Sequence, residues 1–513
     1  MTVRRGSPRH AQRRTRLLAR PPRPQDAGRR RARPRRADAH LRGPARARVP
    51  PRARAARLGR PARRPRRYLG PNHPAFLETL FAAGMLGAVF VPLNTRLAGP
   101  EIVHQLADSG VSVLVHAPSH ADLVDGVRDR VPVREHVALD GPSRWAHGYE
   151  RLCDRAAPLD VPVSLDDPCM IMYTSGTTGA AKGATLTHGN ITWNAINVLI
   201  DHDLVAGDTA LVSAPLFHTA GLNMLTLPVL LKGGACVLVP AFDPAATLDL
   251  IAEHRVTFMF GVPTMFQRVA REPGWDGADL SSLRILTCGG APVPPSLIDT
   301  YQKRGLTFLQ GYGMTEAAPG TLFLDAAHAT SKAGSAGVPH FFSDVRVVAP
   351  DMTDVPPGET GEVVVRGPHV MPGYWGRPDA TAAVFTGGWF RSGDAARLDD
   401  DGYAYIVDRI KDMIISGGEN VYPAEVEHAI LADPDVLECA VIGVPDETWG
   451  EAGRALFVPR PGSGLTGPAL LARLDGRLAR YKIPKSAVPV AELPRNAAGK
   501  ILKARLREEH GGP

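Results

Sequence analysis

The chain of 513 residues is long enough for two or more domains around a large buried core. Its five cysteines are scattered, odd in number and without CxxC spacing, which argues against a disulfide framework or a zinc site and favours a reducing, cytoplasmic location. The net charge of +8 is uneven, because residues 1–67 carry +23, whereas residues 68–513 hold 35 Lys and Arg against 50 Asp and Glu and carry −15. The body of the chain is therefore acidic, and we expect no nucleic-acid partner for it.

Residues 1–67 contain 25 arginines, no lysine and only Asp26 and Asp38 as acidic residues. A nucleic-acid-binding arm fits this charge, but no aromatic residues are interleaved to stack on bases. A transit peptide fits the arginine content, but serine is scarce and proline abundant. We favour a third interpretation, a GC-rich gene translated out of frame, because globular sequence begins abruptly at Tyr68. The segment has too few hydrophobic residues to fold alone, so we expect it to be disordered.

The remaining chain alternates apolar strand-like runs with helical runs, a pattern typical of α/β layering. Residues 75–93 carry Glu78 and divide into a helix and then a buried strand, so they do not predict a membrane span. The runs VSVLVHA, TALVSAP, ACVLVP, VTFMFGVP and LRILTCGG predict strands, and ATLDLIAEH and PPSLIDTYQKR predict helices. Valines alternating between Gly and Pro turns over 342–376 predict antiparallel strands. We place one domain at 68–408 and a second at 409–513.

The segment YTSGTTGAAKG, residues 173–183, lies between the apolar strand CMIMY and a helix that we expect to begin near Thr187 or His188. A glycine-rich turn between a strand and a helix directs backbone N–H groups at an anion, and hydroxyls and Lys182 add donors. The spacing Gly176-x-x-Gly179-x-x-Lys182 is not the Walker pattern. A flexible surface turn has a similar composition, but the motifs that follow favour phosphate binding.

These motifs are, in chain order, APLFHTAGL (214–222), CGGAP (288–292), QGYGMTE (310–316), GWFRSGD (388–394), DRIKDMIISGGENVYPAEVE (408–427) and PRNAAGKILK (494–503). Together they resemble the adenylate-forming superfamily, and its acyl-CoA synthetase branch in particular, over about residues 68–509. The resemblance implies an α/β fold with a large N-terminal AMP-binding domain of stacked β-sheets flanked by helices, carrying a small antiparallel β subdomain. A small, mobile α/β domain follows it.

The implied reaction joins a carboxylic acid to AMP, releases pyrophosphate and then transfers the acyl group to CoA. Because the substrate carboxylate itself attacks the α-phosphorus of ATP, the protein needs no nucleophilic triad. It has to align the reactants and supply positive charge around the phosphates. ATP, Mg²⁺, CoA and a small-molecule acid are therefore the expected ligands.

By the same resemblance, the glycine-rich loop wraps the β- and γ-phosphates. Glu316 would hold Mg²⁺ beside Thr315 at the α-phosphate. Tyr312 would stack on adenine, and Asp394, supported by Arg409, would accept hydrogen bonds from the ribose hydroxyls. The expected ATP and AMP contacts are Thr174, Ser175, Gly176, Thr177, Thr178, Gly179, Lys182, Gly290, Ala291, Pro292, Gln310, Gly311, Tyr312, Gly313, Met314, Thr315, Asp394, Arg409 and Lys500.

Catalysis of the first step is assigned by resemblance to Lys500, with Lys182, Thr315 and Glu316. A compact ammonium on a loop can bridge the attacking carboxylate and the α-phosphate. The alternative is that Lys500 merely solvates a terminal helix, but the glycine before it favours a loop.

The second step needs a thiol to reach the same carbonyl. The resemblance makes Lys411 the hinge about which the small domain rotates between the steps. Gly417 and Gly418 would then line the pantetheine tunnel, where side chains would block entry. An ordinary turn before a helix near Pro423 is the alternative.

The acyl pocket is assigned by resemblance to His218, Ala220 and Gly221. His218 would be a wall or gate of the pocket. The small Ala220 and Gly221, the run LNMLTLPVLL, taken as a wholly apolar helix, and the small residues 317–320 favour a dry, open pocket. We therefore expect a medium- to long-chain fatty acid, with an aryl or cinnamic acid as the alternative. CoA is expected as acceptor in preference to a carrier protein.

The sequence departs from the family pattern at Ala181 and over residues 1–67. Ala181 replaces the proline usual before the loop lysine, which should loosen the turn only modestly. Residues 1–67 show no strand or helix that could replace the elements with which such enzymes open, so an inactive, N-terminally disrupted remnant or an Arg-rich binding arm is a further alternative. Fatty-acid delivery would suit a weak peripheral membrane contact, although no basic amphipathic helix supports it. The oligomeric state is not predicted.

Overall fold

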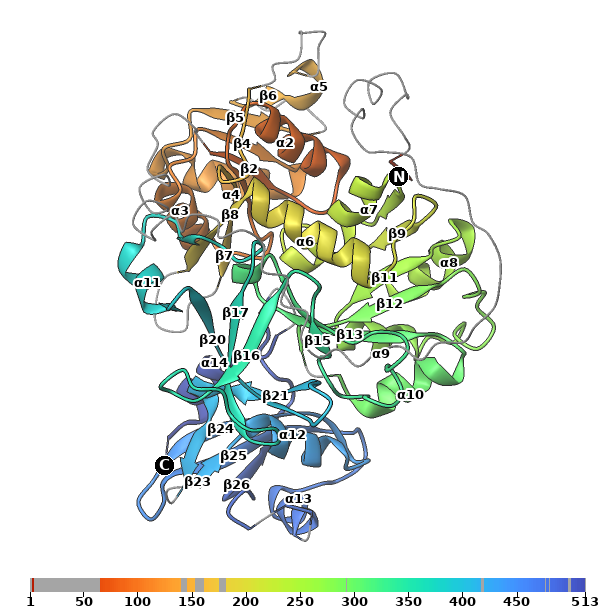
Figure 1. Cartoon of the computed structure of the whole chain (residues 1–513), viewed down its shortest axis with the longest axis vertical. Helices are drawn as coiled ribbons and strands as arrows, with labels where there is room; N and C mark the ends of the chain where they lie inside the picture. Colours follow the sequence, from red (N-terminus) through yellow and green to blue (C-terminus); the bar gives the residue numbers. More distant parts are fainter. Residues whose placement is uncertain are drawn as a thin grey trace, which may run out of the picture.

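The computed structural model describes residues 2–3, 65–139, 145–152, 161–174, 181–291, 293–416, 419–475, 477–478, 480–496 and 500–512. The predictions for residues 4–64, for loop residues 175–179, for Pro292, and for Gly417 and Gly418 concern positions outside this description. The described residues form two large sheets with helices, a small antiparallel subdomain and a separate C-terminal unit (Figure 1), which confirms the predicted α/β class.

The first large sheet has the strand order β18-β8-β7-β3-β2-β4-β5-β6. Its strands are β2 (Arg66–Leu69), β3 (Phe90–Pro92), β4 (Val113–His116), β5 (Glu135–Ala138), β6 (His147–Gly148), β7 (Pro168–Thr174), β8 (Lys182–Thr187) and β18 (Gly373–Tyr374). The helices of this region are α2 (Pro74–Met85), α3 (Gly99–Asp108), α4 (Ala121–Val127) and α5 (Tyr149–Leu152), with 3-10 turns at Pro118–His120 and Arg128–Arg130. The predicted helix and strand within 75–93 are α2 and β3.

The second large sheet has the strand order β1-β10-β9-β11-β12-β13-β14-β15. Its strands are β1 (Thr2–Val3), β9 (Thr209–Val212), β10 (Ala235–Leu238), β11 (Phe258–Gly261), β12 (Ile285–Cys288), β13 (Phe308–Gly313), β14 (Gly320–Phe323) and β15 (Val338–Pro339). Its helices are α6 (His188–Asp201), α7 (Leu227–Lys232), α8 (Pro244–Glu253), α9 (Pro263–Val269) and α10 (Pro295–Lys303). Strands β9 to β13 are parallel and mostly buried, as their continuous apolar runs predict.

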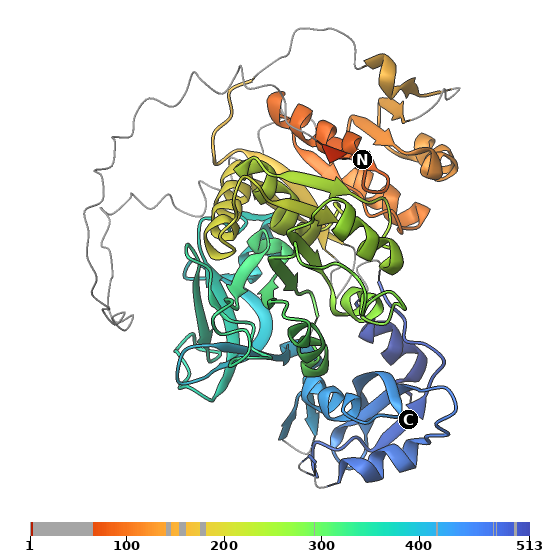
Figure 2. The same cartoon turned by 90° about the vertical axis from the view of Figure 1, so that its right-hand side faces the viewer.

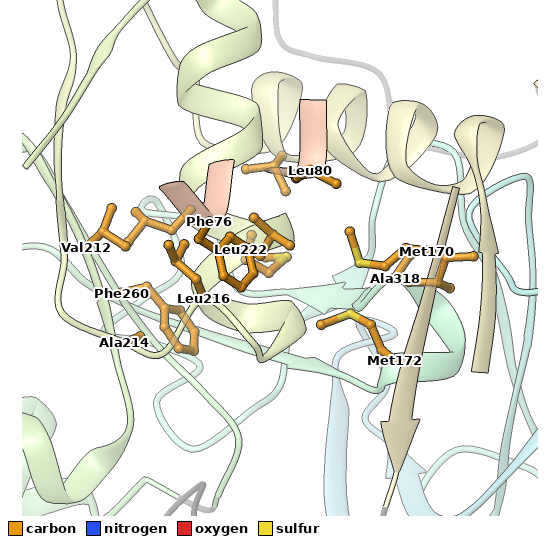
Figure 3. Close-up of a cluster of buried hydrophobic side chains, with 14 of the residues drawn as sticks. Phe76, Leu80, Met170, Met172, Val212, Ala214, Leu216, Leu222, Phe260 and Ala318 are labelled. Carbon is orange, nitrogen blue, oxygen red and sulfur yellow. The ribbon is translucent and has the colours of Figure 1, made fainter. Parts of the chain in front are cut away.

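A hydrophobic cluster joins the two large sheets (Figure 3). Helix α6 packs against β7 and β8 of the first sheet and against β14 of the second. The labelled side chains of the cluster come from both sheets, from α2 and from the segments after β9 and β13: Phe76, Leu80, Met170, Met172, Val212, Ala214, Leu216, Leu222, Phe260 and Ala318. The site described below is therefore held between two sheets that share one core.

The antiparallel subdomain consists of β16 (Asp344–Val348), β17 (Thr360–Arg366), β19 (Phe385–Thr386), β20 (Trp389–Leu398) and β21 (Ala404–Arg409), with α11 (Pro378–Ala383) beside it. All of its strand pairs are antiparallel, as the alternating valines predict.

The C-terminal unit follows a 3-10 turn at Ile410–Asp412 and forms a separate body at one end of the molecule (Figure 2). It has its own hydrophobic core. It comprises β22 (Ile414–Ser416), β23 (Glu419–Val421), α12 (Pro423–Leu431), β24 (Val436–Asp446), β25 (Gly450–Pro459), α13 (Gly467–Leu474), β26 (Ser486–Pro489) and α14 (Lys503–His510). Among the helices in the described ranges, none combines the length and apolar character needed to cross a bilayer.

The structure corrects the first boundary. Strand β2 begins at Arg66, two residues before the predicted start of the domain, and lies between β3 and β4. Thr2 and Val3, for which no strand was expected, pair with β10 as an antiparallel edge. Both corrections arise from long-range backbone pairing, which composition alone does not reveal.

Candidate active site

Strands β13, β20 and β21 bring together the residues expected at adenosine. The hydroxyl of Tyr312 donates to Asp394 Oδ2 at 2.6 Å, and Arg409 Nε lies 3.0 Å from Asp394 Oδ1. Asp394 faces Arg409 in the β20–β21 register. A carboxylate has about four lone-pair sites, so each Asp394 oxygen can still accept one further donor. Burial, followed by the charge of Asp394, raises the pKa of Tyr312 well above its ordinary value.

Glycine is required where β13 meets β14. A Cβ on Gly313 would lie 2.0 Å from the carbonyl oxygen of Pro319. This close approach folds the chain back on itself through the 3-10 turn Thr315–Ala317 and places Thr315 and Glu316 beside the Tyr312–Asp394 pair.

Glu316 has a partner that the sequence analysis did not identify. Tyr374, on β18, donates its hydroxyl to Glu316 Oε1 at 2.9 Å, and Met371 N donates to the Glu316 carbonyl at 2.8 Å. The ammonium of Lys182 lies 5.5 Å from the centre of the Tyr374 ring. Burial raises the pKa of Glu316, and the bond from Tyr374 lowers it in part. Tyr374 lies within the range 342–376, where the sequence predicted antiparallel strands and no site residue.

The surroundings of the glycine-rich loop differ from the prediction. Lys182 begins strand β8, which pairs antiparallel with β7, so the loop closes a hairpin and does not lead into a helix. Thr174 faces Lys182 where the two strands end. Helix α6 begins only after β8, capped by Thr187, whose hydroxyl accepts from Asn190 N at 3.0 Å. A helix N-terminus therefore does not contribute to phosphate binding by this loop. The expected donors are the hydroxyls of the loop and Lys182.

The residues of this site suit a magnesium ion bound by one carboxylate and substrate phosphates, and not one enclosed by several protein ligands. Among the residues that the structure describes, no three His, Cys, Asp or Glu side chains gather as a metal cluster. Mg²⁺ is commonly held by one or two carboxylates together with substrate phosphates. Glu316 suits this arrangement, because it is a partly buried carboxylate next to Thr315, and a bound cation would favour its ionised form.

The segment expected to form the acyl pocket is a π-helix, Ala220–Thr226, which continues into α7. A Cβ on Gly221 would lie 2.4 Å from the carbonyl oxygen of Pro215. The space beside Gly221 is therefore filled by backbone and is not open to an acyl chain. The helix is not wholly apolar either, because Asn223 is 1% exposed within it. The expectation of an open, purely apolar wall is therefore wrong at these two positions.

Two polar side chains in and just before the π-helix have buried atoms without partners. Within the described part of the chain, the Nδ2 and Oδ1 of Asn223 and the Nε2 of His218 make no hydrogen bond. Burial, with a smaller effect of the Arg96 charge, lowers the pKa of His218 to about 4, so the imidazole is neutral at pH 7. Unpaired buried polar atoms cost about 1–3 kcal/mol each, which is why such atoms often face a ligand.

The other predicted ATP contacts lie at the ends of the central strands. Gln310 and Gly311 are on β13, Met314 follows it, and Gly290 and Ala291 follow β12. Gln310 Nε2 is a further buried nitrogen with no partner in the described ranges. Parallel strands that end at one edge place such residues side by side.

Lys500 lies on a loop of the C-terminal unit, as predicted. Its backbone N donates to Asn496 Oδ1 at 2.9 Å, and its carbonyl accepts from Asn496 N at 2.8 Å. This turn fixes the backbone and leaves the Lys500 side chain exposed. Its approach to the α-phosphate stays a prediction, as does the hinge role of Lys411.

Two family models and several known enzymes match most of this chain. The AMP-binding enzyme family matches residues 68–375, and the AMP-binding enzyme C-terminal domain matches residues 425–500. Feruloyl-CoA synthases from Amycolatopsis and Streptomyces are 58% identical over 448 residues, covering 86% of this chain and 88% of theirs. The chain therefore belongs to the AMP-binding enzyme family.

Three further relatives are informative. An indoleacetate–CoA ligase from Aromatoleum aromaticum is 46% identical over 86% of this chain and 87% of its own. A long-chain-fatty-acid–CoA ligase from Mycobacterium tuberculosis is 40% identical with the same coverage. The crystal structure of ATP-bound MatB from Rhodopseudomonas palustris superposes with a TM-score of 0.82 at 31% identity, covering 89% of this chain and 92% of MatB. The chain is thus an AMP-forming acyl-CoA synthetase that uses ATP and CoA.

Proposed function

We propose that the carboxylic acid is a hydroxycinnamate such as ferulate, which the chain converts to its acyl-AMP and then to its CoA thioester. The observation that carries the proposal is the 58% identity to feruloyl-CoA synthases over 448 residues. The relative named for indoleacetate, at 46%, acts on another aryl acid, whereas the relative named for long-chain fatty acids is 40% identical. The cinnamoyl alternative is therefore better supported than the fatty acid that the sequence favoured.

The buried polar atoms of the π-helix segment support an oxygenated ring. A hydrocarbon chain beside Asn223 and His218 would leave their nitrogen and oxygen atoms unpaired, whereas a phenol or methoxy oxygen could pair with them. Sites that hydrogen-bond a substrate hydroxyl reject analogues that lack it far more strongly than apolar pockets discriminate by size.

Within this function, we assign the roles by residue. Lys182 and the loop hold the β- and γ-phosphates, Thr315 and Glu316 act at the α-phosphate with Mg²⁺, and Lys500 stabilises the charge that shifts during adenylation. The hydrogen bond from Tyr374 orients the Glu316 carboxylate. Rotation of residues 409–513 about Lys411 would then admit CoA.

A panel of acids tests the substrate class. Pyrophosphate release from Mg-ATP is measured in the presence of CoA, with ferulate, 4-coumarate, cinnamate, laurate and palmitate as the acid. We expect kcat/KM for ferulate to exceed that for laurate by at least about a hundredfold. A preference for laurate or palmitate would overturn the proposal and restore the fatty-acid assignment.

One substitution tests the contribution of the buried amide. Asn223→Leu should reduce the preference for 4-coumarate over cinnamate by about tenfold, because the leucine cannot pair with a ring hydroxyl. Met224→Leu changes the neighbouring buried side chain without removing a polar group and should leave the preference unchanged. An unchanged preference in Asn223→Leu would show that this amide does not meet the ring.

A further inference from the structure

Helix α6 presents a row of buried amides on one face. Asn190, Asn194 and Asn197 are at most 5% exposed and are spaced four and three residues apart, which aligns them along the helix. Buried amides are expensive unless they are paired, and each of these bonds a separate segment. The three amides therefore hydrogen-bond α6 to segments that are far away in sequence.

Asn194 fastens two segments of the candidate active site at once. Its Nδ2 donates to the carbonyl of Asn223 at 2.9 Å, in the π-helix. Its Oδ1 accepts from Gly320 N at 3.0 Å, at the start of β14. The fit is close, because a Cβ on Gly320 would lie 3.0 Å from the same Oδ1. One fully buried side chain thus joins the segment with the unpaired amide to the segment that follows Thr315 and Glu316.

Asn190 secures the other side of the same turn. Its Nδ2 donates at 2.8 Å to the carbonyls of Pro368 and Val370. The next residue, Met371, donates its N–H to the carbonyl of Glu316. Residues 315–320 are therefore held directly by Asn194 at Gly320 and indirectly by Asn190, through Met371, at Glu316. Asn197, by contrast, bonds Phe342 N at 2.8 Å, outside this turn.

We propose that Asn194 is a positioning residue for acyl-AMP formation, which holds the turn of Thr315 and Glu316 and the π-helix in fixed relative placement. It touches neither the acid nor the nucleotide. It acts through Gly320 on the turn and through the Asn223 backbone on the acid-binding segment. Its assignment rests on the proposed roles of these two segments.

The test compares Asn194→Ala with Asn197→Ala, which removes an equally buried amide from the same helix face. In ATP-dependent pyrophosphate release with the acid that the wild-type chain uses best, Asn194→Ala should lose about ten- to a hundredfold in kcat. The KM for ATP should stay within about threefold, because the adenosine contacts at Asp394 are independent of Asn194. Asn197→Ala should keep kcat within about threefold while losing a similar amount of urea resistance. Equal kcat values for the two variants would overturn the proposal.

A second variant covers the case in which Asn194→Ala does not fold. Asn194→Asp keeps the acceptor for Gly320 N and loses the amide donor to the Asn223 carbonyl, so it cuts one of the two links. We expect it to lose at least about tenfold in kcat with the acid that the wild-type chain uses best. An unchanged kcat would contradict a role for Asn194. The kcat comparison uses whichever acid is best, so it decides on Asn194 separately from the hydroxycinnamate proposal.

Discussion

At the scale of single residues, the resemblance to the adenylate-forming superfamily pointed to three residues that the structure brings together. Tyr312, Asp394 and Arg409 come from three motifs far apart in sequence, and the structure brings them within hydrogen-bonding distance. Tyr374 and Asn223 were not predicted. Each is one polar group in a segment whose glycines or leucines dominate its pattern, and only tertiary packing reveals what a lone polar side chain meets.

Removing the Tyr374 hydroxyl should change the pH dependence of adenylation. The bond from Tyr374 lowers a Glu316 pKa that burial has raised, so Tyr374→Phe should raise it further. The carboxylate would then ionise at higher pH, and the acidic limb of the kcat profile should move upward. We expect a larger loss of kcat on the acidic side of the profile than at pH 8.

The matched control is Tyr301→Phe, which removes a buried hydroxyl bonded to the Phe266 carbonyl at 2.9 Å. This tyrosine packs in another cluster, so its variant should keep the wild-type pH profile. If both variants kept the same profile, Tyr374 would have no influence on the ionisation that limits adenylation.

Lys500→Ala should abolish acyl-AMP formation, with a loss of at least about a hundredfold in pyrophosphate release. Thioester formation from supplied acyl-AMP and CoA should continue. Arg505→Ala is the control, because Arg505 is a nearby exposed cation that pairs with Glu509. Retained adenylation in Lys500→Ala would refute the assignment.

At the scale of elements, apolar runs bounded by turns predicted the central strands and helices, and their burial explains why. The exception is β8, because its sequence KGATLT contains no apolar run and the helix signal of α6 follows directly. Its identity as a strand depends on antiparallel pairing with β7, a contact that no local pattern encodes. Strand β2 was also not predicted in full, because its sequence places an arginine, Arg67, in the core.

Arg67 is fully buried in β2. Its Nη2 donates to the Gln105 carbonyl and to Ser109 Oγ, whereas its Nε and Nη1 have no partner in the described ranges. Burial lowers its pKa to about 10, so the group stays charged at pH 7 at a cost in desolvation. Arg67→Val should therefore raise the free energy of unfolding by about 1–3 kcal/mol in urea denaturation.

The neighbouring Arg66 is the control, because it is only half-buried and its Nη1 donates to Ser112 Oγ at 2.9 Å. Arg66→Val should bring no such gain. A stabilising Arg67→Val would also fit the interpretation that the residues before Tyr68 are translated out of frame. A destabilising one would show that this arginine belongs in the strand.

At the scale of the molecule, the order of the motifs predicted a large unit followed by a small one. It did not predict the contacts of residues 408–412, which arise only from tertiary packing. Asp408 of the large unit accepts from Ala424 N of the small unit at 2.7 Å. Within the small unit, Arg507 Nη2 donates to Asp412 Oδ1 at 2.7 Å. A rotation of the small unit about Lys411 would have to break the first of these bonds.

Lys411→Pro should separate the two half-reactions, because proline fixes φ at the proposed hinge. We expect acyl-AMP formation within about threefold of wild type and thioester formation slowed at least about tenfold. Each half-reaction is measured alone, with pyrophosphate release for the first and supplied acyl-AMP for the second. Equal slowing of both would argue against Lys411 as the hinge.

The most direct test of the account is the product balance of one reaction, with ferulate, Mg-ATP and the full-length chain, with and without CoA. The account predicts AMP, pyrophosphate and feruloyl-CoA in equal amounts when CoA is present, and no sustained turnover when either the acid or CoA is left out. Formation of ADP and phosphate, or no turnover of any acid by folded protein, would contradict it.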